Sequence, residues 1–419
     1  MLWAGLSSGE TRAGRRGEWL PLPLKVSILV PGRWHAFELA RELINLGVDV
    51  RLVTSYPRGK TRAWGLPDER VRSLFWHYLL TRLAWEMGGE SVDIPLGRWH
   101  SRMFSLAASR QAEPADVIHA WAGSAWDSLM RRFPSGRPVV LDRGSAHRIR
   151  QDEILGREHR DLGLFWPRRH PAMVRRELGE YQRATKITVP SLFVFRSFTE
   201  QGIDPGRLHL NGYGVDLGQF VPMESQEAER QPLRIIHAGS LSVRKGLHHL
   251  CRGFRKAGLS GAQLLLVGGK TAETDGLIGR DRRGIRLVGH LPQAKLVKEY
   301  QKASLFCLAS LEEGQAMVQL QALACGLPLV CTAHTGGEDL LRQGGSGQPV
   351  GHGITEFPAG FVVPPADSSA VARVLRRFDA DRALLAKKRR AAAELRALDF
   401  SWRAYASRAL SLYHEVLKN

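Results

Sequence analysis

The feature that most constrains the fold is an alternation of short apolar runs with segments of helical periodicity. Residues 24–32, "LKVSILVPG", form a continuous apolar run that ends at Gly32. The next segment, "RWHAFELARELINLG", repeats apolar residues at helical spacing, namely Phe37, Leu39, Ala40, Leu43 and Leu46. Apolar strands that alternate with amphipathic helices are typical of a parallel sheet covered by helices on both faces. The sequence therefore predicts an α/β protein.

This alternation occurs twice in the 419 residues, which are enough for two or three domains. It is interrupted at 221–232, "VPMESQEAERQP", a polar segment without an apolar period, and restarts with "LRIIHAGS". We predict two Rossmann-like domains, an N-terminal one over 25–222 and a C-terminal one over 233–398, joined by a linker over 223–232. A last helix over 399–419 has few core partners left in the second domain, so we expect it to cross back to the first.

The first 24 residues and the cysteines bear on the cellular compartment in which the protein is expected to work. Residues 1–24 carry Glu10, Arg12, Arg15 and Arg16 where a signal peptide has its apolar stretch, so we interpret them as a disordered leader or an upstream start-codon artefact. No apolar run is long enough for a transmembrane helix. The cysteines lack C-x-x-C spacing and are predicted to be reduced core residues of a cytoplasmic protein: Cys251, Cys307, Cys325 and Cys331.

The chain is strongly basic, with 60 Lys and Arg against 41 Asp and Glu and a net charge of +19. Such an excess favours polyanionic partners, which are nucleic acids, anionic membranes or phosphorylated small molecules. Composition does not choose among them. Because no RNA- or DNA-binding module is recognisable, we do not expect nucleic acid to be the partner.

Two segments of the second half predict anion binding. In "HAGSLSVRKGLHHL" a strand ends at Gly239, and Arg244 and Lys245 precede a helix. Helix N-termini attract anions, and Lys245 can donate a charge-assisted hydrogen bond to a phosphate oxygen. The alternative is an ordinary solvated lysine, since neither a P-loop nor a G-x-G-x-x-G motif is present.

Similar helix starts occur in "EEGQAMVQLQALACG" and in "HTGGEDLL" (334–341). Ligands of open α/β sheets bind at the carboxyl ends of the strands, so we predict that the three helix N-termini converge on a diphosphate pocket. Taken singly, each start is also explained by ordinary α/β turn chemistry.

With these segments taken together, the chain resembles the family 4 glycosyltransferases of GT-B fold. The second half is similar through "GSLSVRKGLHHL", "LLLVGG", "VGHLP", "SLFCLASLEEGQAMVQLQALACGLPLVCTAHTGGEDL" and "GFVVPPAD", and the first through "DRGSAHRIRQDEIL" and "ATKITVPSLFVFRSF". The resemblance implies two Rossmann-like domains facing across a cleft. It also implies a nucleotide-diphosphate sugar bound by the second domain and an acceptor bound mainly by the first. Transfer would retain the anomeric configuration, without a metal ion or other cofactor.

The resemblance assigns roles by position. Lys245 would contact the diphosphate, and Glu313 is the first glutamate of the family's Glu-x7-Glu motif, beside the donor sugar. The turn that follows, Gly314, Gln315 and Ala316, would meet sugar hydroxyls or phosphate through its backbone N–H groups, and Met317 is a further donor-binding candidate.

The sequence departs from the family pattern at two donor positions. Ser240 follows the strand glycine Gly239, where the family commonly has arginine, and Arg244 is the candidate to supply the missing charge. Gln321 stands where the second glutamate accepts hydrogen bonds from the ribose. The loss of its charge is expected to cost about 1 kcal/mol, roughly a tenfold loss of donor affinity. We therefore expect a weakened but working donor site.

The first domain supplies the remaining candidates. The resemblance implies a histidine that touches the donor sugar, and His147 in "DRGSAHR" is the candidate, with Asp142, Arg143 and Gly144 nearer the strand end as alternatives. A structural role explains His147 equally well. Gly32 ends the first strand and is expected to face the cleft, where backbone close to a ligand favours glycine.

Basic and aromatic residues gather in "RVRSLFWHYLLTRLAWEMG" (70–88) and "LFWPRRHPAMVRR" (164–176). They fit peripheral docking on an anionic bilayer at the inner face of a membrane, where a lipid-linked acceptor would be reached. The alternative is a buried helix beside a solvated basic face.

Three hypotheses on function follow. The first is a bacterial hexosyltransferase of polysaccharide or glycolipid biosynthesis that acts on a glycan or lipid-linked acceptor. The second is a non-catalytic sugar-nucleotide-binding relative, which Ser240 and Gln321 favour. An epimerase or phosphorylase of the same shape has no support in the sequence.

Overall fold

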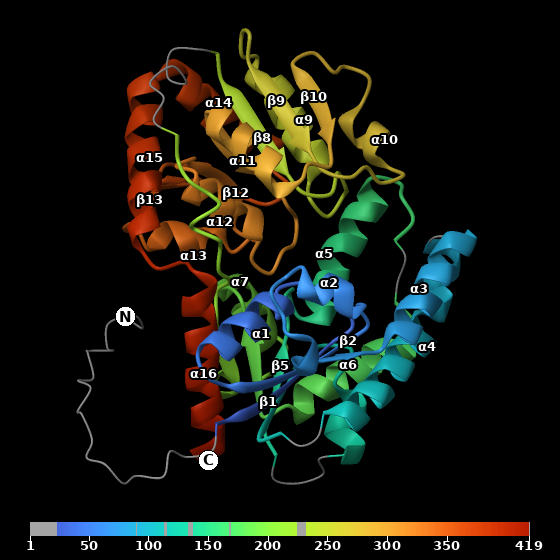
Figure 1. Cartoon of the computed structure of the whole chain (residues 1–419). Coiled ribbons are helices and arrows are strands. Elements are labelled where there is room, and N and C mark those ends of the chain that lie inside the picture. The colour runs from blue at the N-terminus through green and yellow to red at the C-terminus, as the bar shows by residue number, and fades with distance from the viewer. Residues whose placement is uncertain are drawn as a thin grey trace, which may run out of the picture.

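The computed structural model describes residues 23–88, 90–112, 115–132, 137–166, 169–223 and 232–418. They form two α/β domains, one above the other in Figure 1, each built around its own sheet. The predicted leader and linker fall mostly on residues 1–22 and 224–231, which lie outside the described residues. The two-domain α/β architecture predicted from the alternation is confirmed.

In the described residues, the first sheet has seven strands in the order β3-β2-β1-β4-β5-β6-β7, and the paired strands are parallel. Its strands are β1 (Lys25–Val30), β2 (Asp49–Thr54), β3 (Val71–Ser73), β4 (Val117–Trp121), β5 (Val139–Asp142), β6 (Lys186–Val189) and β7 (Leu208–Leu210). The order reverses between β1 and β4, which is the point where doubly wound sheets bind their ligands.

The second sheet repeats this order as β10-β9-β8-β11-β12-β15, and adds the antiparallel strands β14 and β13 at its edge. Its strands are β8 (Arg234–Ala238), β9 (Gln263–Val267), β10 (Ile285–Gly289), β11 (Leu305–Leu308), β12 (Leu329–Thr332), β13 (Gln348–Pro349), β14 (Thr355–Phe357) and β15 (Gly360–Val363). β8, β11 and β12 are almost wholly buried, as their continuous apolar sequences predict.

Helices cover both faces of each sheet (Figure 1). The first domain contains α1 (Ala36–Asn45), α2 (Arg58–Arg62), α3 (Phe75–Gly88), α4 (Glu90–Gln111), α5 (Arg148–Asp161), α6 (Pro171–Arg183) and α7 (Leu192–Thr199), with short turns at Asp68–Arg70, Ser128–Arg132 and Pro205–Arg207. The second contains α9 (Leu247–Ala257), α10 (Thr274–Ile278), α11 (Gln293–Lys302), α12 (Met317–Ala324), α13 (Gly337–Arg342), α14 (Ser368–Ala380), α15 (Arg382–Glu394) and a turn at Leu395–Ala397. α1 buries Phe37, Leu39, Ala40 and Leu43, the residues whose spacing predicts it.

The last helix, α16 (Trp402–Lys418), returns from the second domain to the first, as predicted (Figure 1). Its Tyr413 hydroxyl lies 2.7 Å from Nδ1 of His119 on β4. Arg408 donates to the Asn211 side-chain oxygen at 2.8 Å. The chain thus passes between the domains a second time, and α16 packs beside α1.

Two further predictions can be compared with the structure. All four cysteines are buried and unpaired, and burial raises the pKa of the Cys251 thiol to about 12. They are therefore core residues. Among the described residues, no helix combines the length and the hydropathy that a membrane crossing requires.

Candidate active site

A cavity of about 660 Å³ lies between the two domains. It is bounded by the segments that follow β1, β4 and β5 in the first domain and β8 and β11 in the second, at the carboxyl ends of both sheets. Its lining includes Trp34, His35, Asp142, Arg143, Arg148, Asp152, Trp166 and Arg169 from the first domain and Arg244, Lys245, Glu313, Gln315, Ala316 and Met317 from the second. The cavity occupies the place where α/β sheets bind ligands.

Two cations and one carboxylate face each other on the second-domain side. Lys245 Nζ forms an ion pair with Glu313 Oε1 at 2.5 Å, and Arg244 Nη2 lies 3.3 Å from Glu313 Oε2. Burial alone would lower the pKa of Arg244, but Glu313 and Glu312 raise it above its ordinary value. Arg244 is therefore a permanent cation in the lining of the cavity.

Glu312, the residue before Glu313, joins the two domains. One of its carboxylate oxygens accepts from the backbone N–H of Ala146 at 2.8 Å, and the other accepts from Gln151 Nε2 at 2.8 Å and from Arg244 Nε at 2.9 Å. Burial would raise its pKa, but Arg244 and the two first-domain donors lower it below the ordinary value. The sequence analysis assigned no role to Glu312, because its partners come together only when the domains meet.

The turn after Glu313 brings the backbones of the two domains close together. A Cβ atom added to Gly314 would lie 2.5 Å from the carbonyl carbon of Gly144, so only glycine fits. Gln315 is buried, and its Oε1 accepts from the backbone N–H of Tyr213 at 2.5 Å. Ala316 and Met317 line the cavity at the start of α12, whose first N–H groups have no partner within the helix.

The segment 334–341 does not share this cavity, which corrects the prediction of three converging helix N-termini. His334 and Asp339 line a separate cavity of about 180 Å³ with residues of α7. The carboxylate of Asp339 accepts from the backbone N–H of Leu192 at 2.7 Å, so the start of α13 contacts the first domain. The second domain therefore contributes the start of α12 and the two residues Arg244 and Lys245, which precede α9, to the main cavity.

Other predicted donor residues lie outside the lining of the main cavity. Ser240 is exposed, with its hydroxyl 3.3 Å from that of Ser242. Gln321 is half-buried on α12, and its Oε1 lies 3.5 Å from the Tyr300 hydroxyl. Gly239 has a φ of +141°, and a Cβ atom there would lie 3.3 Å from Cε of Lys245. Glycine thus leaves room for Lys245 beside the end of β8.

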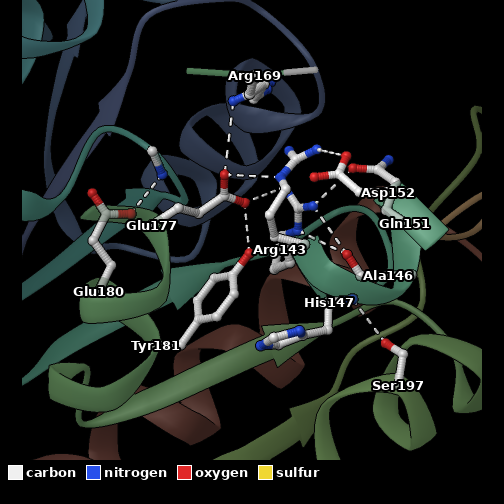
Figure 2. Close-up of polar contacts among 12 residues, drawn as sticks. Arg143, Ala146, His147, Gln151, Asp152, Arg169, Glu177, Glu180, Tyr181 and Ser197 are labelled. Atoms are coloured by element: carbon white, nitrogen blue, oxygen red, sulfur yellow. Dashed lines mark hydrogen bonds and ion pairs between the residues drawn. The ribbon is translucent and has the colours of Figure 1, made fainter. Parts of the chain in front are cut away.

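Gly32 and His147 are also placed differently from the prediction that they face the ligand. Gly32 precedes Trp34, whose ring occupies the cavity side of that turn. The His147 ring is buried against Tyr181 and Phe198, with ring centroids 5.0 Å from each. Burial and then Arg143 lower its pKa to about 4, so the ring is neutral. Figure 2 shows it beside Tyr181, with its backbone N–H donating to Ser197.

Three arginines share one carboxylate at the first-domain wall of the cavity (Figure 2). Glu177 lies 2.8 Å from Arg143, 3.1 Å from Arg148 and 3.7 Å from Arg169. Burial would raise the pKa of Glu177, but these guanidinium groups lower it to about 2. Burial, followed by the charge of Arg148, lowers the pKa of Arg169. The wall is therefore electropositive and suits a ligand that carries negative charge.

A histidine that the sequence analysis did not single out faces the cavity instead of His147. His35 follows β1, and its Nε2 lies 3.2 Å from Asp142 Oδ2. The Asp142 carboxylate also accepts from the Thr188 hydroxyl at 3.1 Å; burial opposes its ionisation, but His35 and His119 lower its pKa. Asp142 therefore holds the His35 ring in place. The sequence signal was available, because His35 comes three residues after Gly32, the glycine at which the sequence predicts the first strand to end.

Family models match both halves of the chain. Residues 33–219 match the model described as Glycosyltransferase Family 4, and residues 232–381 match the one described as Glycosyl transferases group 1. The amylovoran biosynthesis glycosyltransferase AmsK of Erwinia amylovora is 23% identical over 383 residues, which cover 80% of this chain and 84% of AmsK.

Solved structures share the fold. Sucrose-phosphate synthase from Thermosynechococcus elongatus superposes with a TM-score of 0.70 at 18% identity, covering 94% of this chain and 99% of that one. HepE of Anabaena, in complex with UDP-glucose, superposes with a TM-score of 0.62 at 17% identity, covering 93% and 100% of the two chains.

Proposed function

The chain belongs to family 4 of the glycosyltransferases, and we propose that it transfers a hexose from a nucleotide-diphosphate sugar to an acceptor hydroxyl with retention of configuration. The observation that carries the proposal is the pair of cations, Arg244 and Lys245, beside the start of α12 at the interdomain cavity. HepE, which shares the fold, binds UDP-glucose, and this supports a nucleotide sugar as donor.

The cations fit the charge that develops in the reaction. When the bond from the anomeric carbon to the diphosphate oxygen breaks, negative charge accumulates on the leaving diphosphate. Lys245, Arg244 and the N–H groups at the start of α12 stabilise that charge more strongly as it grows. Glu313 now pairs with Lys245 at 2.5 Å, so an arriving diphosphate competes for the lysine and leaves Glu313 available to sugar hydroxyls.

Retention follows in this proposal if the acceptor attacks from the face that the diphosphate leaves. The acceptor oxygen bonds to the anomeric carbon, and its proton passes to the departing phosphate oxygen, so atoms and charge balance without a metal ion. We propose that His35, rather than His147, is the first-domain histidine that contacts the donor sugar. The support is its position in the cavity lining and its bond to Asp142.

We propose that the acceptor is a glycan or lipid-linked saccharide reached at a membrane surface. α3 and α4 lie side by side at one edge of the first domain (Figure 1), and they expose large apolar side chains. Leu83 is 53% exposed and Met87 79%, and the exposed row also includes Phe75, Trp76, Leu79, Leu80, Trp99 and Met103. Arg82, Arg98 and Arg102 lie on the same pair of helices, which suits an anionic bilayer.

Vesicle sedimentation tests the membrane contact. The protein is expected to sediment with phosphatidylglycerol vesicles and to remain in solution with phosphatidylcholine alone. Leu83→Glu with Met87→Glu should abolish binding, whereas Leu417→Glu, at an exposed leucine of α16, should not. Equal sedimentation of all three proteins would contradict this part of the proposal. Because the cysteines are unpaired, we place the reaction in the cytoplasm.

The alternative is a non-catalytic relative that binds a sugar nucleotide. Two observations favour it. Ser240 and Gln321 stand where charged residues would be expected to contact the donor, and both lie outside the cavity lining. Release of nucleoside diphosphate from UDP-, GDP-, ADP- and TDP-sugars distinguishes the two hypotheses. Turnover that persists in EDTA and falls at least about a hundredfold in Lys245→Ala supports the enzyme, while binding without turnover of any of these donors supports the alternative. NMR of the product's anomeric proton then tests retention.

A further inference from the structure

Three metal-ligating side chains converge at a second contact between the domains. Glu158 lies near the end of α5 in the first domain, and His248 and His249 lie in the first turn of α9 in the second. Glu158 Oε1 is 2.6 Å from His248 Nε2 and 2.8 Å from His249 Nε2. One ligand atom from each residue thus lies within 4.8 Å of the other two.

The three side chains are largely shielded from solvent. The side chains of His248 and His249 are 1% and 9% exposed, and that of Glu158 is 14% exposed. The imidazole centroids are 4.1 Å apart, so two imidazolium charges would repel each other strongly. Neutral imidazole is the form that binds metal ions.

In the metal-free structure each Nε2 donates to the Glu158 carboxylate, so a metal ion must displace both of these protons. Each Nε2 must present its lone pair, which places the proton on Nδ1. For His249, Nδ1 lies 3.4 Å from the hydroxyl of Ser368, which can accept that proton. For His248, Nδ1 is buried without a partner among the described residues, so a proton that moves there replaces no existing hydrogen bond.

The distances fit a small divalent ion after a slight adjustment. Ligands about 2.0–2.1 Å from a tetrahedral zinc ion are about 3.3 Å from one another. The two nitrogen–oxygen distances are 2.6 and 2.8 Å. Opening them to that value requires the ligand atoms to move apart by about 0.5–0.7 Å. Two imidazoles and one carboxylate then leave a fourth position for water.

We propose that Glu158, His248 and His249 bind Zn²⁺, or a divalent ion of similar ligand preference, and that this ion joins the two domains. Imidazole with carboxylate suits zinc, cobalt or nickel, whereas magnesium and calcium prefer oxygen ligands. The ion takes no part in sugar transfer, since its site lies outside the cavity lining.

Because of its position, an ion bound at this site is expected to affect the donor site. His248 comes three residues after Lys245, and Glu158 belongs to the helix that also supplies Arg148 and Gln151. A metal bond between α5 and α9 would hold the domains in the arrangement seen here, with the cavity closed between them. Because donor entry and product release require opening in enzymes with such clefts, bound zinc is expected to slow turnover.

Calorimetric titration of the full chain with Zn²⁺ tests the proposal independently of any sugar-transfer activity. We expect one ion per chain, and a Co²⁺ form with the visible absorption of tetrahedral cobalt. Affinity should fall by at least about a hundredfold in His248→Gln and in Glu158→Gln, and His414→Gln, at an exposed histidine of α16, should match the wild type. Thermal unfolding of the metal-free variants shows that each is folded, and Mg²⁺ should produce no effect.

Saturable binding that depends on both Glu158 and His248 supports the site. The absence of saturable binding, or binding that is equally strong in the folded His248→Gln and Glu158→Gln proteins, would overturn it. In either of those cases the three residues form a hydrogen-bonded contact between the domains. The proposed transferase activity is unaffected by that outcome, because it depends on Lys245 and the cavity.

Discussion

The buried carboxylate of Glu312 provides a sharp test of how the two domains are held together. It is completely buried, and its two oxygens accept from the Ala146 backbone, the Gln151 side chain and the Arg244 side chain. Glu312→Gln keeps the shape of the side chain but removes the charge. It also replaces one acceptor oxygen with an NH2 group, which must face at least one of these donors.

The expected loss in the free energy of unfolding follows from the donors that Glu312→Gln leaves without a charged acceptor. Hydrogen bonds to a charged group contribute about 1.5–3 kcal/mol, and leaving one partner of a buried ion pair unmatched costs about 3–5 kcal/mol. Arg244 retains Glu313 at 3.3 Å, so we expect the lower part of that range, about 3 kcal/mol. Glu153→Gln is the matched control, because that glutamate is half exposed on α5 and lies 3.4 Å from Arg150. Its loss should cost less than about 1 kcal/mol.

Differential scanning calorimetry and urea unfolding of the two variants measure the difference. Glu312→Gln should lower the transition temperature by several degrees more than Glu153→Gln. The pKa of Glu312 is lowered in the folded protein, so its contribution is complete above the pKa of an unfolded glutamate and declines as the pH falls below it. The deficit of Glu312→Gln should therefore shrink in acid. If the two variants are equally stable at neutral pH, Glu312 does not hold the domains as described.

Further predictions concern the donor site, the closed arrangement and acid stability. Gln321→Glu should tighten nucleotide-sugar binding roughly tenfold by calorimetry; unchanged affinity would show that the ribose does not reach this residue. Gly314→Ala should separate the domains, because its Cβ would lie 2.5 Å from the carbonyl carbon of Gly144, and small-angle scattering should report a larger radius of gyration. Glu177 has a pKa of about 2 against 4.5 ordinarily, so about 3 kcal/mol of stability should be present above pH 4.5 and be lost as the pH falls toward 2. Glu177→Gln should remove that part of the acid transition, and an unchanged acid profile would contradict the pairing.

The parts of the fold that depend on local pattern were predictable. The apolar runs predict strands such as β1 and β8, and the helical spacing of Phe37 and Leu43 predicts α1. The return of α16 to the first domain was also predictable, because a long helix at the end of the chain needed partners. These features depend on burial and periodicity, which a single sequence displays.

The details of the site depend on contacts between distant segments. His147 and His35 are both histidines near a strand end, and only packing decides that Tyr181 and Phe198 enclose the first while the second faces the cavity. Likewise, the roles of Glu312 and Gly314 arise because the domains meet at that turn. Position along the chain alone predicts neither which histidine faces the cavity nor the roles of Glu312 and Gly314.

The central claim is that Arg244 and Lys245 form the anion site of a nucleotide-sugar donor. A thermal-shift panel of UDP, GDP, ADP and TDP, with the corresponding sugar conjugates, tests it most directly when Lys245→Ala is measured beside the wild type. Lys256→Ala, at an exposed lysine on α9, is the control. The account predicts that one base raises the unfolding temperature of the wild type and of Lys256→Ala and leaves Lys245→Ala unchanged. A shift that survives in Lys245→Ala, or no shift with any nucleotide, would contradict it.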